Sequence, residues 1–205
     1  MSYVPDTTTR DEFLAERNIR SRQMAQVALR QFDIFCNNTY EKNGDVLIQD
    51  IKSTGIFEKS YTVLNQFSMW LSEDHLEISV PMGKSSRPMT KRMPRTIYSY
   101  LVVLKSYFEE FGGIEINDRR FKKRVKIPKK ITVELEPFTH EQIRLICDIA
   151  SSNRKTLYMT LKDSGMRVGE ATQLIKSDID ITKNPIEIKI RAETTKTKQA
   201  RTTFV

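Results

Sequence analysis

The chain has 205 residues, of which 39% are hydrophobic and 29% are charged, a composition typical of a soluble globular protein and not of a disordered one. Its length is sufficient for one large domain or two small ones, each with a core. The 34 lysines and arginines exceed the 26 acidic residues, so the formal net charge is +8, which favours a polyanionic partner without by itself identifying nucleic acid.

Several classes of protein are excluded by simple patterns. There is no unbroken apolar run long enough to cross a bilayer, and the polar N-terminus lacks the apolar core of a signal peptide. Two cysteines, Cys36 and Cys147, are too few for a disulfide framework or a cysteine zinc site. No acidic or histidine cluster has metal-ligand spacing, so we expect an intracellular, cytoplasmic protein with no metal and no cofactor.

Residues 1–118 are predicted to form a helical domain with three amphipathic helices. The first carries apolar positions from Met24 to Phe35 and is expected to begin near a cap at Thr7–Thr9, and the second covers Val63–Leu71. The third is opened by Pro94 and closed by Gly112–Gly113. Its stripe, at i, i+4, i+7, i+11 and i+14, consists of Ile97, Leu101, Leu104, Phe108 and Phe111. This spacing favours core packing over the alternative of a base-stacking platform.

A basic segment follows this domain. Residues 119–137 are predicted to be an extended linker, because no helical apolar stripe runs through them and Pro128 and Pro137 interrupt them. The alternative is a solvated run of charge with no partner. The candidate DNA contacts in this segment are Arg119, Arg120, Lys122, Lys123, Arg124 and Lys126.

A second basic cluster precedes the third helix and supports a phosphate-bearing partner. We expect its side chains and the free amides of that helix start to face a phosphate backbone. The cluster consists of Lys84, Arg87, Lys91, Arg92 and Arg95.

Residues 138–205 are predicted to be three helices followed by two strands. Thr139 and Gln142 fit a capping box that opens the first helix, and the second, near residues 154–162, ends at Ser164–Gly165. A third is expected from about Arg167 to Asp178. Alternating isoleucines at 186, 188 and 190 indicate a half-buried strand, which we expect to pair with residues 202–205 across a loop at 193–200.

The corner at Gly165 carries the most informative residues. Arg167 and Glu170 lie three apart on one helical face, where the carboxylate can orient the guanidinium. A rigid, always-charged fork suits a phosphate. On spacing alone, however, the same pair is an ordinary surface ion pair.

In combination, these patterns resemble the tyrosine recombinases, the family of phage integrases and Xer-like DNA strand-exchange enzymes. The resemblance covers nearly the whole chain. It rests on Ser164–Glu170, Leu174, Asp178–Asp180, the alternating strand and Lys196–Arg201, preceded by a helical region, a basic linker and a capped helix. It implies a mainly α chain: a helical, SAM-like core-binding domain (1–118), the linker (119–137) and an incomplete α+β catalytic domain (138–205).

The resemblance also implies roles for individual residues. Arg167 matches the arginine that binds the non-bridging oxygens of the scissile phosphate, and Glu170 matches its acidic support. Lys196, separated by four residues from Arg201, matches the lysine that acts as general acid toward the leaving 5′ oxygen, with Lys198 the weaker candidate. Lys198 and Arg201 are further candidate DNA contacts. The implied partners are duplex DNA and other recombinase protomers in a synaptic assembly, and the implied location is the cytoplasm, in association with the nucleoid.

The sequence departs from the family pattern in one respect. The remaining catalytic elements, which include the nucleophilic tyrosine, lie downstream of the hairpin in the family, whereas all seven tyrosines and both histidines here precede Arg167. We therefore expect that these 205 residues alone do not cleave DNA. The predicted function is site-specific DNA recombination. The alternatives are a non-catalytic module that occupies recombination sites and a helical interaction protein that does not bind DNA.

Overall fold

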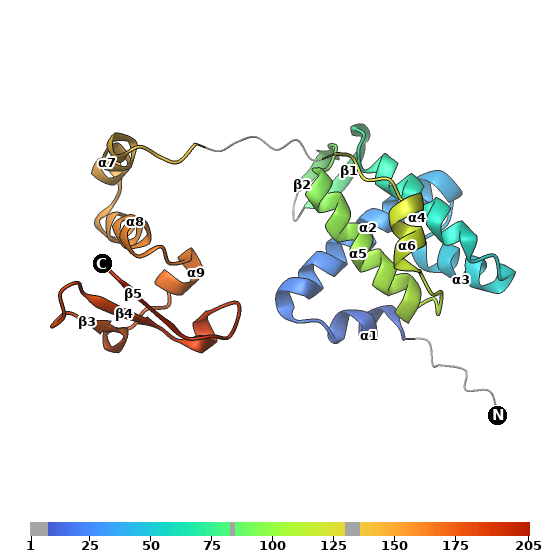
Figure 1. Ribbon diagram of the computed structural model, residues 1–205. Coiled ribbons are helices and arrows are strands. Elements are labelled where there is room, and N and C mark those ends of the chain that lie inside the picture. Colours follow the sequence, from blue (N-terminus) through green and yellow to red (C-terminus); the bar gives the residue numbers. More distant parts are fainter. Residues whose placement is uncertain (1–7, 83–84, 130–135) are drawn as a thin grey trace, which may run out of the picture. The chain divides into compact units, whose positions relative to one another are not determined.

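A computed structural model describes residues 8–82, 85–129 and 136–205 of the chain. The chain divides into two compact units, unit 1 (residues 1–132) and unit 2 (residues 133–205). The described part is mainly helical, with two small antiparallel sheets (Figure 1). None of its helices combines the length and the apolar character needed to span a bilayer.

Unit 1 is a helical bundle with one hairpin. Its helices are α1 (Arg10–Ala15), α2 (Ile19–Tyr40), α3 (Gly44–Thr54), α4 (Glu58–Trp70), α5 (Pro94–Glu110) and α6 (Asp118–Arg124), and its strands are β1 (His75–Met82) and β2 (Ser85–Met89). Helix α2 packs on α3 and α5, while α4 packs on α5 and α6 (Figure 1). The apolar stripe of α5 and the aromatic residues of α2 and α4 meet in one core, as the periodicity predicts.

The N-terminal helix differs from the prediction. Thr9 caps the short helix α1 through a capping box with Glu12, and the chain starts again at α2 with Asn18 as the new cap. The single helix expected from the Thr7–Thr9 cap is therefore two helices. Helix α3 and the β1–β2 hairpin were not predicted, although Ile78 and Val80 alternate along β1 in the way that a strand requires.

The prediction that residues 119–137 form an extended linker is wrong at its N-terminal end. Residues 118–124 form helix α6, whose cap is Asn117. Phe121 and Val125, four residues apart, are 7% and 4% exposed because they join the unit 1 core, and α6 packs on α4. Two apolar positions make a stripe too short to recognise in sequence. The boundary between the units falls at Thr132–Val133, inside the predicted linker.

The described part of unit 2, residues 136–205, contains three α-helices and a three-stranded antiparallel sheet of order β3–β4–β5. Its elements are α7 (His140–Ile149), α8 (Ser152–Ser164), α9 (Val168–Ala171), the 3-10 turns η1 (Lys176–Asp178) and η2 (Ala192–Thr194), and the strands β3 (Ile179–Asp180), β4 (Glu187–Ile190) and β5 (Arg201–Phe204). The predicted capping box at Thr139 and Gln142 is confirmed. So is the glycine cap of α8, since Gly165 has φ +63°.

The third helix of unit 2 is much shorter than predicted. It ends at Ala171, and the chain turns into η1 instead of continuing to Asp178. The Asp178 carboxylate accepts a hydrogen bond from the backbone N–H of Ile175 at 3.0 Å and so begins a new turn. Leu174 packs against the small core formed by Met166, Ile188 and Ile190.

Candidate functional site

The glycine corner places Arg167 at the start of α9. After the left-handed turn at Gly165, Met166 inserts into the core at 6% exposure, and Arg167 becomes the N-cap of α9. Strand β5 braces the corner, because the Thr203 hydroxyl donates to the Ser164 carbonyl at 2.7 Å. The position of Arg167 is thus determined by packing on one side and a hydrogen bond on the other.

The carboxylate of Glu170 is the centre of the site. It is 2% exposed and accepts four hydrogen bonds. Oε1 accepts from Arg167 Nη1 at 2.9 Å and Arg201 Nη1 at 3.0 Å, and Oε2 accepts from the Arg167 backbone N–H at 2.9 Å and Arg201 Nη2 at 2.8 Å. The predicted pairing of Arg167 with Glu170 is confirmed, and a second arginine shares the same carboxylate.

The hydrogen bonds determine the charge of this buried carboxyl group. Those from Arg201, the largest cause, and from Arg167 lower the pKa of Glu170 to about 2 against the opposing effect of desolvation. Glu170 is therefore ionised at neutral pH. With two guanidinium groups and one carboxylate, the cluster carries a net charge of +1.

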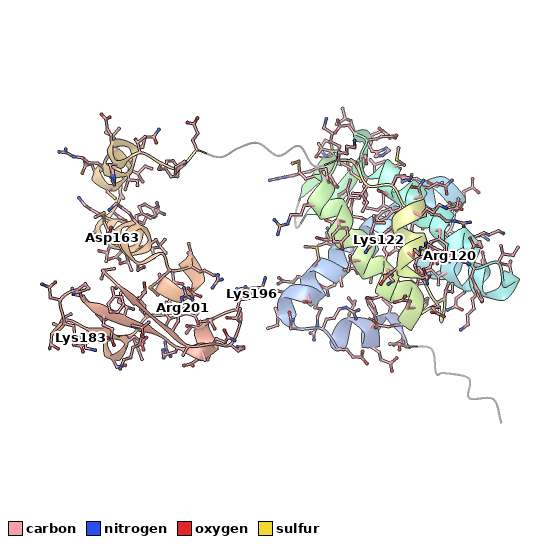
Figure 2. All side chains as sticks on the ribbon, in the orientation of Figure 1. Arg120, Lys122, Asp163, Lys183, Lys196 and Arg201 are labelled. Carbon is pink, nitrogen blue, oxygen red and sulfur yellow. The ribbon has the colours of Figure 1, made fainter. Side chains whose placement is uncertain are left out.

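The two arginines are placed differently. Arg201 lies at the start of β5 (Figure 2). It donates from both Nη atoms to Glu170 as a bidentate pair. Arg167 donates to that carboxylate from one side-chain nitrogen, and its side chain is 59% exposed. Arg167 can therefore meet an anion from solvent. The role of Arg201 toward Glu170 had no local signal in the sequence, because the residues are 31 positions apart.

The predicted lysines lie in the loop between β4 and β5 and not in the Glu170 cluster. Lys196 is exposed at the tip of this loop (Figure 2), and none of the hydrogen bonds or ion pairs of the described residues joins it to Arg167 or Glu170. Lys198 has φ +56°, and its Nζ lies 3.4 Å from the Glu193 carbonyl. Buried Thr195 braces the loop, since its hydroxyl accepts from the Gln199 backbone N–H at 3.1 Å.

Helix α6 arranges the basic residues of unit 1 on distinct sides. Phe121 faces the core, whereas Arg120 and Arg124 both form ion pairs with Glu58 of α4, the first at 2.7 Å. The remaining side is exposed and has no ion pair or hydrogen bond from its side chains to the described residues. It consists of Arg119, Lys122 and Lys123, with Lys126 exposed just beyond the helix. The structure thus separates basic residues that hold α6 from basic residues open to a partner.

The second basic cluster is only partly at a helix start. Arg95 lies in the first turn of α5, but Arg87 belongs to β2, and Lys91 and Arg92 lie in the connection between them. Arg92 is half-buried, and its Nε has no hydrogen-bond partner. Lys84 lies outside the described residues. Of the described members, Arg95 therefore lies at the helix start, Lys91 and Arg92 immediately precede it, and Arg87 lies apart from it on β2.

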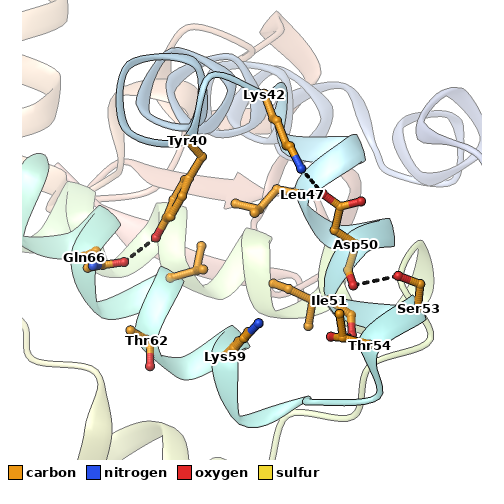
Figure 3. A pocket seen from close by; sticks show the side chains of 11 residues that line it. Tyr40, Lys42, Leu47, Asp50, Ile51, Ser53, Thr54, Lys59, Thr62 and Gln66 are labelled. Atoms are coloured by element: carbon orange, nitrogen blue, oxygen red, sulfur yellow. Dashed lines mark hydrogen bonds and ion pairs between the residues drawn. The ribbon is translucent and has the colours of Figure 1, made fainter.

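Unit 1 also has a groove of about 600 Å³ beside α3 and α4 (Figure 3). Four of its polar side chains are paired with each other: Lys42 forms an ion pair with Asp50 at 2.5 Å, and the Tyr40 hydroxyl donates a hydrogen bond to Gln66. The groove's buried floor is formed by Leu47, Ile51 and Val63. It has neither a paired acid and base nor an activated nucleophile, so it offers no catalytic set comparable with the Glu170 cluster.

Within residues 8–82, 85–129 and 136–205, no three histidine, cysteine or acidic side chains gather where they could hold a metal ion. Comparison with known proteins finds no matching family model and no matching curated protein.

Proposed function

We propose that this chain is the N-terminal part of a tyrosine recombinase, an enzyme of site-specific DNA recombination by strand breakage and rejoining. The observation that carries the proposal is the Glu170 cluster. A buried carboxylate holds Arg167 at a glycine corner, with its side chain 59% exposed and the cluster at net positive charge. Phosphoryl transfer depends mainly on such positioned positive charge.

In this proposal each unit has a part. Unit 1 is the SAM-like core-binding domain, which binds duplex DNA through the exposed side of α6 and the basic residues around β2. Unit 2 is the start of the catalytic domain, in which Arg167 binds the scissile phosphate. Lys196 protonates the leaving 5′ oxygen, and its exposed ammonium forms no ion pair with the described residues that would have to break first. The complete enzyme would act with further protomers on nucleoid DNA in the cytoplasm.

The test has two stages. A preferred duplex is first selected from a random pool with the full 205-residue chain. Each phosphate of that duplex is then replaced, one at a time, by an uncharged methylphosphonate, and the dissociation constant is measured. We expect one position at which neutralisation weakens binding of the wild type about tenfold, the effect of one lost charge-assisted hydrogen bond. The same substitution should leave the dissociation constant of the Arg167→Ala variant unchanged.

A second candidate function is a DNA-binding module without chemistry. The observation that favours it is the exposed basic side of α6. This surface lies in unit 1, whereas the Glu170 cluster lies in unit 2, so DNA binding by α6 does not require that cluster. In that case substitutions on α6 would weaken binding, but no single phosphate would depend on Arg167. If affinity does not fall as salt rises, both DNA functions are wrong, because phosphate contacts release counterions.

A further inference from the structure

The Glu170 cluster contains a basic residue that the resemblance places among the DNA contacts but that the geometry uses differently. Arg201 directs both of its Nη atoms at Glu170, 3.0 and 2.8 Å away. An arginine that donates one N–H from each Nη atom to a carboxylate forms a bidentate pair, which fixes the plane of its guanidinium group. Arg167, by contrast, uses one guanidinium nitrogen on Glu170 and has no other side-chain hydrogen bond among the described residues.

The charges explain why two arginines are needed. Arg167 and Glu170 alone would form a neutral pair, and an anion approaching Arg167 would also meet the negative carboxylate. With Arg201 bound to Glu170, the carboxylate is neutralised from the other side, and the charge of Arg167 remains available. The carboxylate is 2% exposed, so solvent does little to screen this arrangement.

The pair also has a mechanical consequence. Arg201 is the first residue of β5, opposite Ile190 of β4, whereas Glu170 belongs to α9. The ion pair therefore ties the helix that orients Arg167 to the hairpin whose loop carries Lys196. It joins the two halves of the candidate site across 31 positions of sequence.

We propose that Arg201 is a positioning residue of the candidate site, which acts through Glu170 to orient Arg167 and to leave its positive charge available to one DNA phosphate. This inference rests on the proposed function. Arg201 itself does not need to touch DNA.

The experiment uses the full chain and the methylphosphonate series on the selected duplex. The quantity measured is the phosphate effect, the ratio of dissociation constants with the neutralised and the natural phosphate at the position that depends on Arg167. We expect Arg201→Gln to reduce this ratio from about ten to near one. Arg201→Lys keeps the charge but loses the fork, so it should retain part of the effect.

Two further variants distinguish positioning from general stabilisation. Arg201→Gln combined with Glu170→Gln removes both charges and leaves Arg167 positive, so it should restore part of the phosphate effect. Lys183→Gln is the control, because it removes one positive charge from an ion pair with Glu187, near the β3–β4 end of unit 2 (Figure 2). It should leave the phosphate effect unchanged. Circular dichroism establishes whether each variant is folded. If Arg201→Gln is not folded, the phosphate effect of Arg201→Lys provides the test.

The outcomes separate the two proposals. If folded Arg201→Gln retains the full phosphate effect, Arg201 is not a positioning residue, while the proposed function stands. If the double variant is folded and does not recover any of the phosphate effect, the role assigned to the charge of Arg201 is wrong. If no phosphate depends on Arg167 in the wild type, the proposed function fails, and this inference fails with it.

Discussion

The two units are held together by different forces. Unit 1 buries a continuous core in which Phe32, Phe35 and Phe67 are in mutual ring contact with centroids 5.4–6.1 Å apart. Unit 2 has a cluster of three buried apolar side chains in its described part, and polar contacts connect its elements. The clearest are the Glu170 cluster and the pair of Asp178 with Arg191, at 3.1 Å. Unit 1 therefore rests mainly on an extended apolar core, to which the ion pairs of Arg10 with Asp33 and Asp45 add, whereas unit 2 has a small apolar core and depends more on ionised groups.

The difference extends to the basic residues. In unit 1, Lys122 and Lys123 on the exposed side of α6 have no ion pair or side-chain hydrogen bond among the described residues. In unit 2, Arg201, Arg191 and Lys183 are all bound to carboxylates of the same unit. Arg167 combines both properties, since it has an internal partner and an exposed guanidinium. A cation on the exposed side of α6 can thus change binding without changing stability, whereas Arg201, Arg191 and Lys183 cannot.

The largest effect is expected in the unit 1 core. Phe67→Ala removes a side chain with 0% exposure that contacts Phe32, Phe35 and Trp70, so it should lower the free energy of unfolding by about 3–5 kcal/mol. Denaturant unfolding followed by fluorescence of Trp70 measures it. The matched control is Ile19→Ala on α2 of the same unit, which is 73% exposed and should change stability little. Equal losses would mean that the buried aromatic core does not dominate the stability of unit 1.

The next effect concerns pH and unit 2. Glu170 has a pKa of about 2, below its ordinary 4.5, so the stability it contributes is fully present above about pH 4.5 and is lost as pH falls toward 2. Amide hydrogen exchange of Ile188 should show this loss. Glu170→Gln should weaken unit 2 by about 2 kcal/mol at neutral pH and flatten the pH dependence. Asp163→Asn, which removes an exposed carboxylate on α8, should leave the pH dependence intact (Figure 2).

A smaller effect is expected at the glycine corner. Gly165 has φ +63°, so Gly165→Ala should destabilise unit 2 by about 1–2 kcal/mol even though open space surrounds the added Cβ. Gly169 also has open space around it but lies within α9 without a positive φ, so Gly169→Ala should be neutral or slightly stabilising. Amide hydrogen exchange of Ile188 compares the stability of unit 2 in the two variants. Similar losses at both positions would contradict the role of the corner.

The smallest effect concerns α6. Lys122→Ala should leave the stability of unit 1 unchanged and reduce the slope of log affinity for duplex DNA against log salt by about 0.9, the value for one phosphate contact. Arg120→Ala is the control on the same helix (Figure 2), because Arg120 is paired with Glu58. Its slope should match that of the wild type. A lower slope for Arg120→Ala alone would reverse the assignment of the two sides.

Features with a local cause could be predicted from the sequence. The stripe of α5, the capping box at Thr139, the glycine end of α8 and the alternation in β4 are all present as described. Each depends on residues within one or a few turns, so its pattern is visible without the rest of the chain. Arg167 and Glu170 belong to this group, because they are three positions apart on one corner.

Other features were decided only by tertiary structure. Residues 118–124 became helix α6 because Phe121 could be buried against α4, a surface that the sequence of the segment does not reveal. The helix expected to reach Asp178 stopped at Ala171, where Asp178 instead forms contacts with Ile175 and Arg191. Arg201 met Glu170 because β5 folds back beside α9. In sequence Arg201 is one basic residue among many, and only the folded chain shows which carboxylate it binds.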